Sequence, residues 1–535
     1  MHRTLALTIL LLATAGYSYT FRPEALRAHM RFLADDLLEG RGTGTRGYRI
    51  AAEYVAAQFE GAGLAPGAGS SYFQTVPFLK TVVSPESTVT LTPDSGSPVT
   101  LRFGDAFVTY GDPLNASKNI EAGVVLVGFG VTAPELKVDD YAGVDVRGKI
   151  VAFFTGAPKQ FPDSLRAHYS SSLGKIENAA AHGAIGAIVI TTAEEAARAP
   201  WDRVVRGSKI GSMHWLESDG SPHAVRKELS SGVALGLKGT EMFLAAAGKS
   251  LADLTAQLDS QKVKAVPLPL RASVNLISAH EKVNSDNVVG VVRGSDPVLR
   301  DQYVVYSSHL DHIGITEAVD GDAINNGALD NASGIAATIE IAKAFAALPK
   351  APRRSIIFLA TTAEEKGLKG ADFFANNPTV PIDQIVANIN IDEILMIVPT
   401  KDIVVWGIET SDLGQTARKV AREMGLEISP DPYPEEVVFV RSDQYPFVKR
   451  GVPALFAGIG TKGVDPAVDV EKLQRRWFVT RYHAPKDDLD QPIDYPTGAK
   501  FTEFNYRLGL EVANRTAPPA WTPGNFFGEK FARKK

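Results

Sequence analysis

The sequence contains no cysteine, which excludes disulfide bonds, thiol catalysis and cysteine-ligated zinc. Its 56 basic and 61 acidic residues give a formal net charge of −5. Nucleic-acid-binding proteins usually carry a basic excess, so we expect no nucleic acid partner. No segment after the N-terminus approaches the run of about 18 apolar residues that marks a membrane-spanning helix. We therefore expect no membrane span in the mature protein.

Several catalytic motifs are also missing. The chain has neither a GxSxG nucleophile elbow nor a Walker loop. The segment HEKVN at residues 280–284 begins like the single-zinc motif HExxH but lacks its second histidine. Gly42, Gly44 and Gly47 match GxGxxG, but a predicted helix precedes them where the dinucleotide motif needs a strand, so we interpret this segment as a loop. Serine hydrolase and nucleotide-binding functions are therefore not supported.

The N-terminus has the pattern of a secretory signal peptide. Arg3 supplies positive charge, residues 5–13 form a short apolar stretch, and Ala13-Thr14-Ala15 has the small residues of a cleavage site. The apolar stretch is too short to span a bilayer, and a buried N-terminal helix is the alternative interpretation. We predict a signal peptide at residues 1–20, and hence a secreted or periplasmic protein.

A chain of 535 residues is too long for one ordinary core, so we expect two domains. A hydrophobic fraction of 44% and a charged fraction of 22% are typical of a soluble globular protein. We predict that residues 21–118 begin the main domain with two helices and short strands. Residues 119–270 then form a smaller inserted domain, residues 271–520 complete the main domain, and residues 521–535 form a C-terminal tail.

Strands and helices alternate after residue 287. Apolar segments at 288–294, 303–309, 355–362, 385–392 and 402–408 are predicted strands, separated by helical patterns such as 334–348 and 366–377. This alternation predicts an α/β fold with a mostly parallel mixed sheet flanked by helices. The near-continuous apolar character of the strands is typical of parallel strands buried on both faces.

Five residues with metal-ligand chemistry lie in short polar breaks after or between these apolar stretches. They are His309, Asp330, Glu365, Asp392 and His483, in the segments SSHLDH, GALDNASG, TTAEEKG, NINIDE and RYHAPKDD. Loops at the carboxyl ends of parallel strands meet at one edge of the sheet, so we expect these side chains to converge. Nitrogen and oxygen donors without sulfur favour zinc, with manganese or cobalt as alternatives. Two divalent ions can share a bridging carboxylate, so the set predicts a two-metal hydrolase.

Each acidic residue also has an ordinary structural interpretation. Asp330 precedes a predicted helix and could cap it. Glu364 and Glu365 could add negative charge to a helix start. Asp311 could orient the imidazole of His309 or be an unremarkable neighbour. The joint pattern favours the metal interpretation, because a ligand beside a free carboxylate is what a water-activating site needs.

The motifs resemble, in the same order, those of the secreted di-zinc aminopeptidase family typified by aminopeptidase Y and bacterial leucyl aminopeptidases. The resembling segments are HLDH, GALDNASG, TAEEKGLKGADFF, NINID, RSDQYPF, GVPALF and YHAPKDD. The resemblance implies a zinc peptidase catalytic domain that acts on peptide substrates. The segments YAGVDVRGKIV and IENAAAHGAIGAIVI resemble a protease-associated domain inserted into it.

The resemblance also implies a metal ligand set with two Zn²⁺ per chain. Asp330 would bridge the two ions. His309 and Asp392 would complete one site, while Glu365 and His483 would complete the other.

The remaining roles rest on the same resemblance. Glu364 would be the general base, and Tyr482 would stabilise the tetrahedral oxyanion. Arg441 would contact the substrate. Apart from the resemblance, we assign Asp311 to the catalytic set, because a carboxylate two residues after His309 could orient the site. The family often has methionine where Glu393 stands and histidine where Gln444 stands. Neither position is a metal ligand.

Other functions remain open on the same scaffold. Carboxypeptidase or dipeptidase activity would require a basic pocket for a substrate carboxylate, which the sequence does not reveal. A glutaminyl cyclase needs only one zinc ion, whereas both metal sites look intact here. A non-catalytic receptor or scaffold would have lost ligands, and all five are present.

Overall fold

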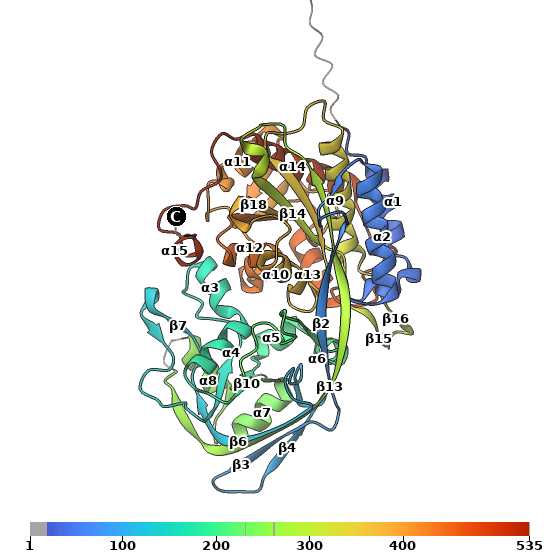
Figure 1. Ribbon diagram of the computed structural model, residues 1–535. Helices are drawn as coiled ribbons and strands as arrows, with labels where there is room; N and C mark the ends of the chain where they lie inside the picture. The colour runs from blue at the N-terminus through green and yellow to red at the C-terminus, as the bar shows by residue number, and fades with distance from the viewer. Residues whose placement is uncertain (1–18, 230–231, 260–262, 534–535) are drawn as a thin grey trace, which may run out of the picture.

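The computed structural model describes residues 19–229, 232–259 and 263–533, so the predicted signal peptide lies almost wholly outside the described residues. Two units, each built on its own part of a long sheet, are joined by the strands β2 (Phe73–Val83) and β13 (Val266–Val292) (Figure 1). We call them the main unit, which contains both ends of the described chain, and the inserted unit.

The main unit is built on a mixed sheet with a parallel centre. The strand order is β2, β13, β17 (Ser355–Thr361), β14 (Tyr303–His309), β18 (Ile385–Asn390), β21 (Ala454–Ile459), β19 (Asp402–Trp406) and β20 (Glu427–Ser429). The four strands from β17 to β21 run parallel, and β13 and β19 pair antiparallel at their flanks. Every residue of β14 and β17 is buried, as expected for strands covered on both faces. The predicted α/β fold class is confirmed.

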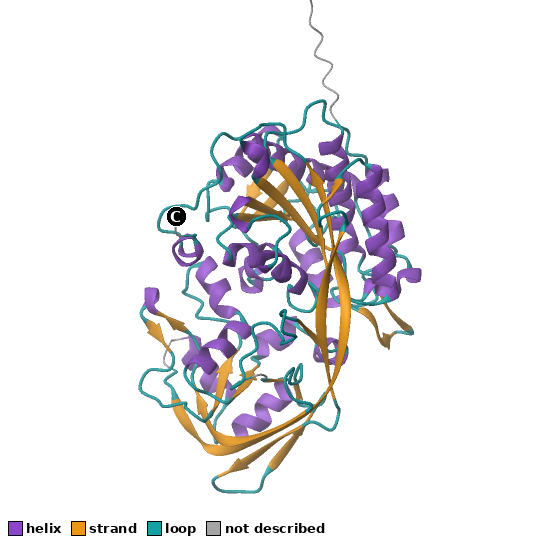
Figure 2. Ribbon diagram, viewed as in Figure 1, coloured by secondary structure: helices purple, strands orange, loops and turns teal. Residues whose placement is uncertain are grey.

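Helices cover both faces of this sheet (Figure 2). One face packs against α1 (Pro23–Leu33), α2 (Arg46–Gly61), α9 (Ser333–Ala346), α11 (Leu413–Glu423) and α14 (Tyr495–Asn514). The other packs against α10 (Lys369–Asn376) and α12 (Gln444–Lys449). The helix α13 (Val470–Thr480) contributes Trp477 to the first core. Short strands β1 (Ala65–Pro66), β15 (Gly314–Val319) and β16 (Asp322–Asn325) lie at the periphery.

The inserted unit has its own sheet and core. Its strands follow the order β4 (Val99–Arg102), β3 (Thr88–Pro93), β13, β6 (Ser117–Leu126), β9 (Ile150–Phe154), β10 (Gly186–Ile190), β12 (Val233–Leu235) and β5 (Phe107–Val108). Its helices are α3 (Asp163–Ser170), α4 (Ser172–Ala181), α5 (Ala193–Arg198), α6 (Trp201–Lys209), α7 (Leu237–Ala246) and α8 (Leu251–Asp259). Two further short strands, β7 (Thr132–Ala133) and β8 (Val138–Asp139), pair with each other. The strand β11 (Ser212–Trp215) returns to pair with β2.

The long strand β13 explains how the two units are connected. Its first part pairs with β3 and β6 in the inserted unit, residues 278–288 pair with β2, and residues 288–292 pair with β17 in the main unit. Residues 279–282 are exposed, because there the paired strands β2 and β13 cross between the two cores. The incomplete HExxH segment at 280–284 lies on this strand and not on a helix.

One boundary differs from the sequence prediction. The strands β3, β4 and β5 at residues 88–108 belong to the core of the inserted unit, whereas we had assigned them to the main domain. Strand alternation could not reveal this, because it does not say which sheet a strand joins. The predicted tail contains α15 (Phe526–Phe531), whose Phe527 is fully buried against Phe439 and Tyr445. Among the described residues, no helix has the length and apolar character needed to cross a membrane.

A buried lysine makes the stability of the inserted unit depend on pH. Lys175 is 3% exposed, and its ammonium donates hydrogen bonds to the carbonyl oxygens of Phe154 and Gly156. Burial lowers its pKa to about 7, although Glu195 and Asp140 act in the opposite direction. The unfolded chain keeps this proton up to the ordinary pKa of 10.5. Between these values the unfolded state binds more protons, so the contribution of Lys175 to stability rises with pH.

We therefore predict a pH-dependent effect of Lys175→Met. The free energy of unfolding of the wild type, relative to this variant, should increase by on the order of 3 kcal/mol from pH 7 to pH 10. Urea denaturation at both pH values measures this difference. The exposed Lys149 is the matched control, since Lys149→Met should give the same difference at both values. A pH-independent difference for Lys175→Met would contradict the prediction.

Candidate metal centre

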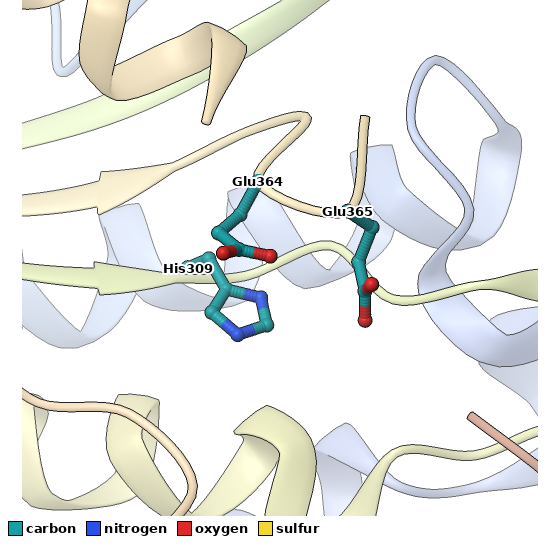
Figure 3. A group of neighbouring side chains, drawn as sticks. All are labelled: His309, Glu364 and Glu365. Atoms are coloured by element: carbon teal, nitrogen blue, oxygen red, sulfur yellow. The ribbon is translucent and has the colours of Figure 1, made fainter. Parts of the chain in front are cut away.

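The sequence-predicted ligands converge at one edge of the main sheet. His309 is the last residue of β14, Glu364 and Glu365 follow β17, and Asp392 follows β18. Asp330 and His483 come from the loops before α9 and after α13. The three strands are parallel neighbours, so their carboxyl ends place these loops together. Figure 3 shows Glu364 and Glu365 projecting from one turn towards the level of the His309 ring.

One group of ligands surrounds the imidazole of His309. Its Nε2 lies 2.9 Å from Oδ1 of Asp392 and 3.2 Å from Oδ1 of Asp330. All three side chains are buried, and one donor atom from each lies within 4.8 Å of the others. The Nδ1 of His309 lies 3.0 Å from the carbonyl oxygen of Asp311, to which it donates its proton. Nε2 is then left with its lone pair facing the carboxylates, as metal ligation requires.

A second group shares Asp330 with the first. The Nε2 of His483 lies 3.3 Å from the second oxygen, Oδ2, of Asp330 and 3.0 Å from Oε2 of Glu365. His312, which the sequence analysis did not assign, is fully buried beside them, with Nδ1 2.7 Å from Oε1 of Glu365. In the sequence, the feature that could have identified His312 is its position three residues after His309 in HLDH.

Unpartnered atoms indicate what these groups bind. Oδ2 of Asp330, Oε1 of Glu365 and both ring nitrogens of His312 are buried and form no hydrogen bond with the described residues, although His312 Nδ1 and Glu365 Oε1 are only 2.7 Å apart. Buried polar atoms normally have partners, so carboxylate and imidazole atoms left in this state favour a bound cation. Imidazole nitrogens and carboxylate oxygens, without sulfur, fit zinc.

The electrostatics of the centre follow from burying many carboxylates together. Burial alone would lower the pKa of His309, but Asp392 and Glu364 raise it well above its usual value. Burial would raise the pKa of Glu365, but His483 and His312 lower it to about 2. The carboxylates around each imidazole therefore favour a positive charge at this position.

Glu364 differs from its neighbour. It approaches His309 and Glu365, with one donor atom of each within 4.8 Å of the others. Its pKa is raised well above the usual value, by burial first and then by the nearby carboxylates Asp392 and Glu365, against the effect of His309. Its carboxylate forms no hydrogen bond with the described residues, so it remains available to exchange a proton.

Asp311 stabilises the turn that carries Glu364 and Glu365. Its carboxylate accepts hydrogen bonds from the backbone N–H of Glu364 at 3.0 Å and of Glu365 at 3.4 Å, and from the hydroxyl of Thr43 at 3.0 Å. Only its main-chain carbonyl contacts the ring of His309. Asp311 therefore fixes the position of the 364–365 turn.

Two further supports come from residues that the sequence analysis did not single out. Asp487 accepts hydrogen bonds at 3.0 Å from the backbone N–H groups of Leu329 and Asp330. The buried guanidinium of Arg41 donates to the carbonyl oxygens of Leu310 and Gly327, both at 2.9 Å. Asp487 lies in the motif YHAPKDD and Arg41 in the glycine-rich loop GRGTGTRG, but nothing in these segments marks which side chain turns inward.

Tyr482 and Arg441 lie beside the ligands. The ring of Tyr482 stacks on that of His483, with centroids 3.7 Å apart. Arg441 donates to the Oε2 of Glu436 at 2.9 Å and to its carbonyl oxygen at 3.1 Å. Both residues line a cavity of about 760 Å³ whose floor contains His309, Asp330, Glu364, Asp392 and His483.

The inserted unit holds the loop that carries His483. Arg203, on α6, donates from Nη1 to the carbonyl oxygen of Phe478 at 2.7 Å and to that of Tyr482 at 3.1 Å. Its guanidinium also lies 5.5 Å from the centre of the Tyr482 ring. One arginine of the inserted unit thus restrains the backbone next to a ligand of the main unit.

Comparison with known proteins relates this part of the chain to a known family. Residues 287–508 match the family model described as peptidase family M28. This segment contains His309, the first ligand along the chain, and His483, the last. A 131-residue segment is 34% identical to aminopeptidase NAALADL1 of Rattus norvegicus, and the match covers 24% of this chain and 16% of the rat protein. A 110-residue segment is 36% identical to a probable zinc metalloprotease of Pyricularia oryzae, covering 20% of this chain and 21% of that protein.

A solved structure extends the similarity to both units. The aminopeptidase from Aneurinibacillus sp. strain AM-1 superposes with a TM-score of 0.55 over 95% of this chain and 97% of that chain, at 18% sequence identity. At this low identity the similarity establishes the fold alone. The curated relatives match over less than a quarter of their own length, so they carry no conclusion about the whole protein.

Because Asp330 faces both groups of ligands, we predict that Asp330→Asn abolishes the response to metal. Zinc should raise the unfolding temperature of the wild type, and a chelator should reverse the gain, since a ligand at about 1,000 times its Kd stabilises by about 4 kcal/mol. Scanning calorimetry of the variant should show no shift. Asp402, a buried carboxylate that accepts the N–H groups of Thr461 and Lys462, is the control. Asp402→Asn should lower stability but keep the zinc response; a zinc response in Asp330→Asn would contradict the shared ligand.

We also predict that Arg203→Met weakens metal binding. Methionine keeps the unbranched stem but removes the donors that hold the 478–482 backbone, so zinc affinity should fall by about tenfold or more. Titration against a competing chelator measures this affinity. Arg206 lies on the same helix and forms no hydrogen bond or ion pair with the described residues, so Arg206→Met should bind zinc like the wild type. Equal zinc affinities of the two variants would show that metal binding does not need the hydrogen bonds of Arg203 to the 478–482 backbone.

Proposed function

We propose that the protein is a di-zinc aminopeptidase that removes N-terminal residues from peptides, because residues 287–508 match the model of peptidase family M28. The observation that carries this proposal is the arrangement of Asp330, whose Oδ1 faces His309 and whose Oδ2 faces His483. A carboxylate in this position can bridge two ions. The predicted signal sequence at residues 1–20 adds export to the proposal.

The donor set divides into two zinc sites. His309 and Asp392 would hold one ion and Glu365 and His483 the other, with Asp330 common to both. His312, in contact with Glu365, would orient that ligand. When bound, the two ions supply Lewis acidity, which lowers the pKa of water and polarises the scissile carbonyl group.

Side chains of the protein would then transfer a proton and stabilise the negative charge of the intermediate. The carboxylate of Glu364 accepts a proton from the attacking water and delivers it to the nitrogen of the leaving amine. The phenol of Tyr482 donates a hydrogen bond to the oxyanion of the tetrahedral intermediate. Asp311 keeps Glu364 in place through its backbone N–H. Arg441 lies in the cavity wall, where the substrate would pass.

We further propose that the inserted unit is a protease-associated domain that limits access to the site. Residues of α5 and α6, including Arg198 and Arg203, line the cavity opposite the ligands. An inserted unit in this position would exclude folded proteins from the cavity and admit the ends of peptides. Access therefore favours exopeptidase over endopeptidase activity.

Carboxypeptidase or dipeptidase activity is the second candidate, and one observation favours it. Arg166 of the inserted unit lines the cavity; its Nε and Nη2 are buried and form no hydrogen bond with the described residues, and only a 3.7 Å ion pair joins Nη2 to Asp163. A guanidinium in this state could bind a substrate carboxylate.

Metal content measured together with hydrolysis separates these candidates. We expect two zinc ions per chain, and cleavage of leucine p-nitroanilide but not of its N-acetyl form. Two zinc ions without cleavage of either substrate would favour the carboxypeptidase or dipeptidase candidate. Absence of bound zinc would instead support a non-catalytic role.

The role of Glu364 as general base predicts a selective loss of activity in Glu364→Gln. The variant should keep its zinc and its unfolding temperature, while kcat falls by about 10²- to 10⁴-fold. Steady-state kinetics and zinc analysis of one preparation measure both quantities. The neighbouring Glu365→Gln is the matched comparison, because it should lose zinc as well as activity. Full turnover by Glu364→Gln would contradict its role.

A further inference from the structure

Charge pairing around the cavity leaves one carboxylate without a partner. Outside the metal centre, the cavity is lined by the carboxylates of Glu194, Glu195, Glu393, Glu435 and Glu436. Four of them face a cation, in the pairs Glu194–Lys159 at 3.5 Å, Glu195–Arg198 at 3.5 Å, Glu435–Arg475 at 2.7 Å and Glu436–Arg441 at 2.9 Å. Glu393 forms no hydrogen bond or ion pair with any residue that the structure describes.

The backbone directs Glu393 into this position. It follows the ligand Asp392 directly and has a φ of 43°, in the left-handed region that residues other than glycine rarely adopt. Such a conformation persists only where the surrounding structure imposes it, and it is commonly associated with functional sites. The side chain of Glu393 consequently lines the cavity beside the metal ligands.

Neither Arg441 nor the two proposed zinc ions need Glu393 to balance their charge. Arg441 attracts it through space, but the guanidinium of Arg441 donates its hydrogen bonds to Glu436. Two divalent ions carry four positive charges, which the carboxylates of Asp330, Glu365, Asp392 and Glu364 already offset. The carboxylate of Glu393 therefore stays without an ion-pair partner among the described residues, beside the metal ligands.

The cavity that Glu393 lines also has walls that suit an extended aliphatic chain. Phe456, Phe478 and Tyr482 line the same cavity and provide apolar surface. A lysine or arginine side chain has an apolar stem that packs on such surfaces and a charged end that a carboxylate can bind.

We propose that Glu393 selects peptides whose N-terminal residue is basic, by forming an ion pair with the side chain of a lysine or arginine in the cavity. This inference rests on the proposed aminopeptidase activity and names its substrate class. Glu393 acts in specificity, without a part in the chemical step.

Substrates that differ only in the terminal charge test the proposal. Norleucine has the stem of lysine without its ammonium group. For the zinc-loaded wild type, we expect kcat/KM to be at least about tenfold higher for lysyl than for norleucyl 7-amido-4-methylcoumarin. Glu393→Met and Glu393→Gln should lower this lysine-to-norleucine ratio by about 10- to 100-fold. Glu194→Gln, which alters another cavity carboxylate, should leave the ratio unchanged.

Two outcomes would overturn the proposal. One is an unchanged ratio in both Glu393 variants. The other is an equal loss on both substrates, which would place Glu393 at the α-ammonium group that the substrates share.

Measurements of amino acid binding test this inference separately from the proposed aminopeptidase activity. If the zinc-loaded wild type cleaves neither substrate, the aminopeptidase proposal fails, and calorimetry with free L-lysine and L-norleucine still tests Glu393. Tighter binding of lysine that is lost in Glu393→Met supports the ion pair. Equal affinities for the two amino acids in the wild type overturn it.

Discussion

The metal centre depends on one constraint, the burial of several carboxylates at the edge of a sheet. Asp330, Glu364, Glu365 and Asp392 converge where β14, β17 and β18 end, and the side chains of Asp330, Glu365 and Asp392 are buried. Buried negative charges are costly unless cations balance them. Atoms of Asp330 and Glu365 that are buried without a hydrogen bond indicate that a bound cation supplies this charge. The fold and its cofactor are therefore thermodynamically linked.

Hydrogen bonds to the main chain hold this arrangement in place. Asp311 fixes the turn of Glu364 and Glu365, Asp487 fixes the backbone before Asp330, and Arg41 links the loops that flank His312. None of these three side chains ligates metal in the proposed centre. They restrict the loops before any ion binds, which lowers the entropy that metal binding must overcome.

The inserted unit contributes to the same centre from the opposite side. The β2–β13 ribbon ties it to the main sheet, and Arg203 bonds to the backbone beside His483. The cavity is therefore bounded by both units, so that residues far apart in the chain determine together what it admits. A glutamate next to a ligand, without an ion-pair partner among the described residues, then offers a cation a binding position at this point of the cavity.

The sequence by itself determined the fold class and the residues of the candidate centre. Apolar strands alternating with helices predict a parallel sheet, and polar breaks after those strands mark its active edge, because both depend on local patterns. It did not determine which sheet the strands at 88–108 join, that His312 and Asp487 face inward, or that Arg203 reaches the loop of His483. Those contacts join residues distant in the chain, and no local preference encodes them. Only the tertiary structure decided them, and with them the charge balance that leaves Glu393 unpaired.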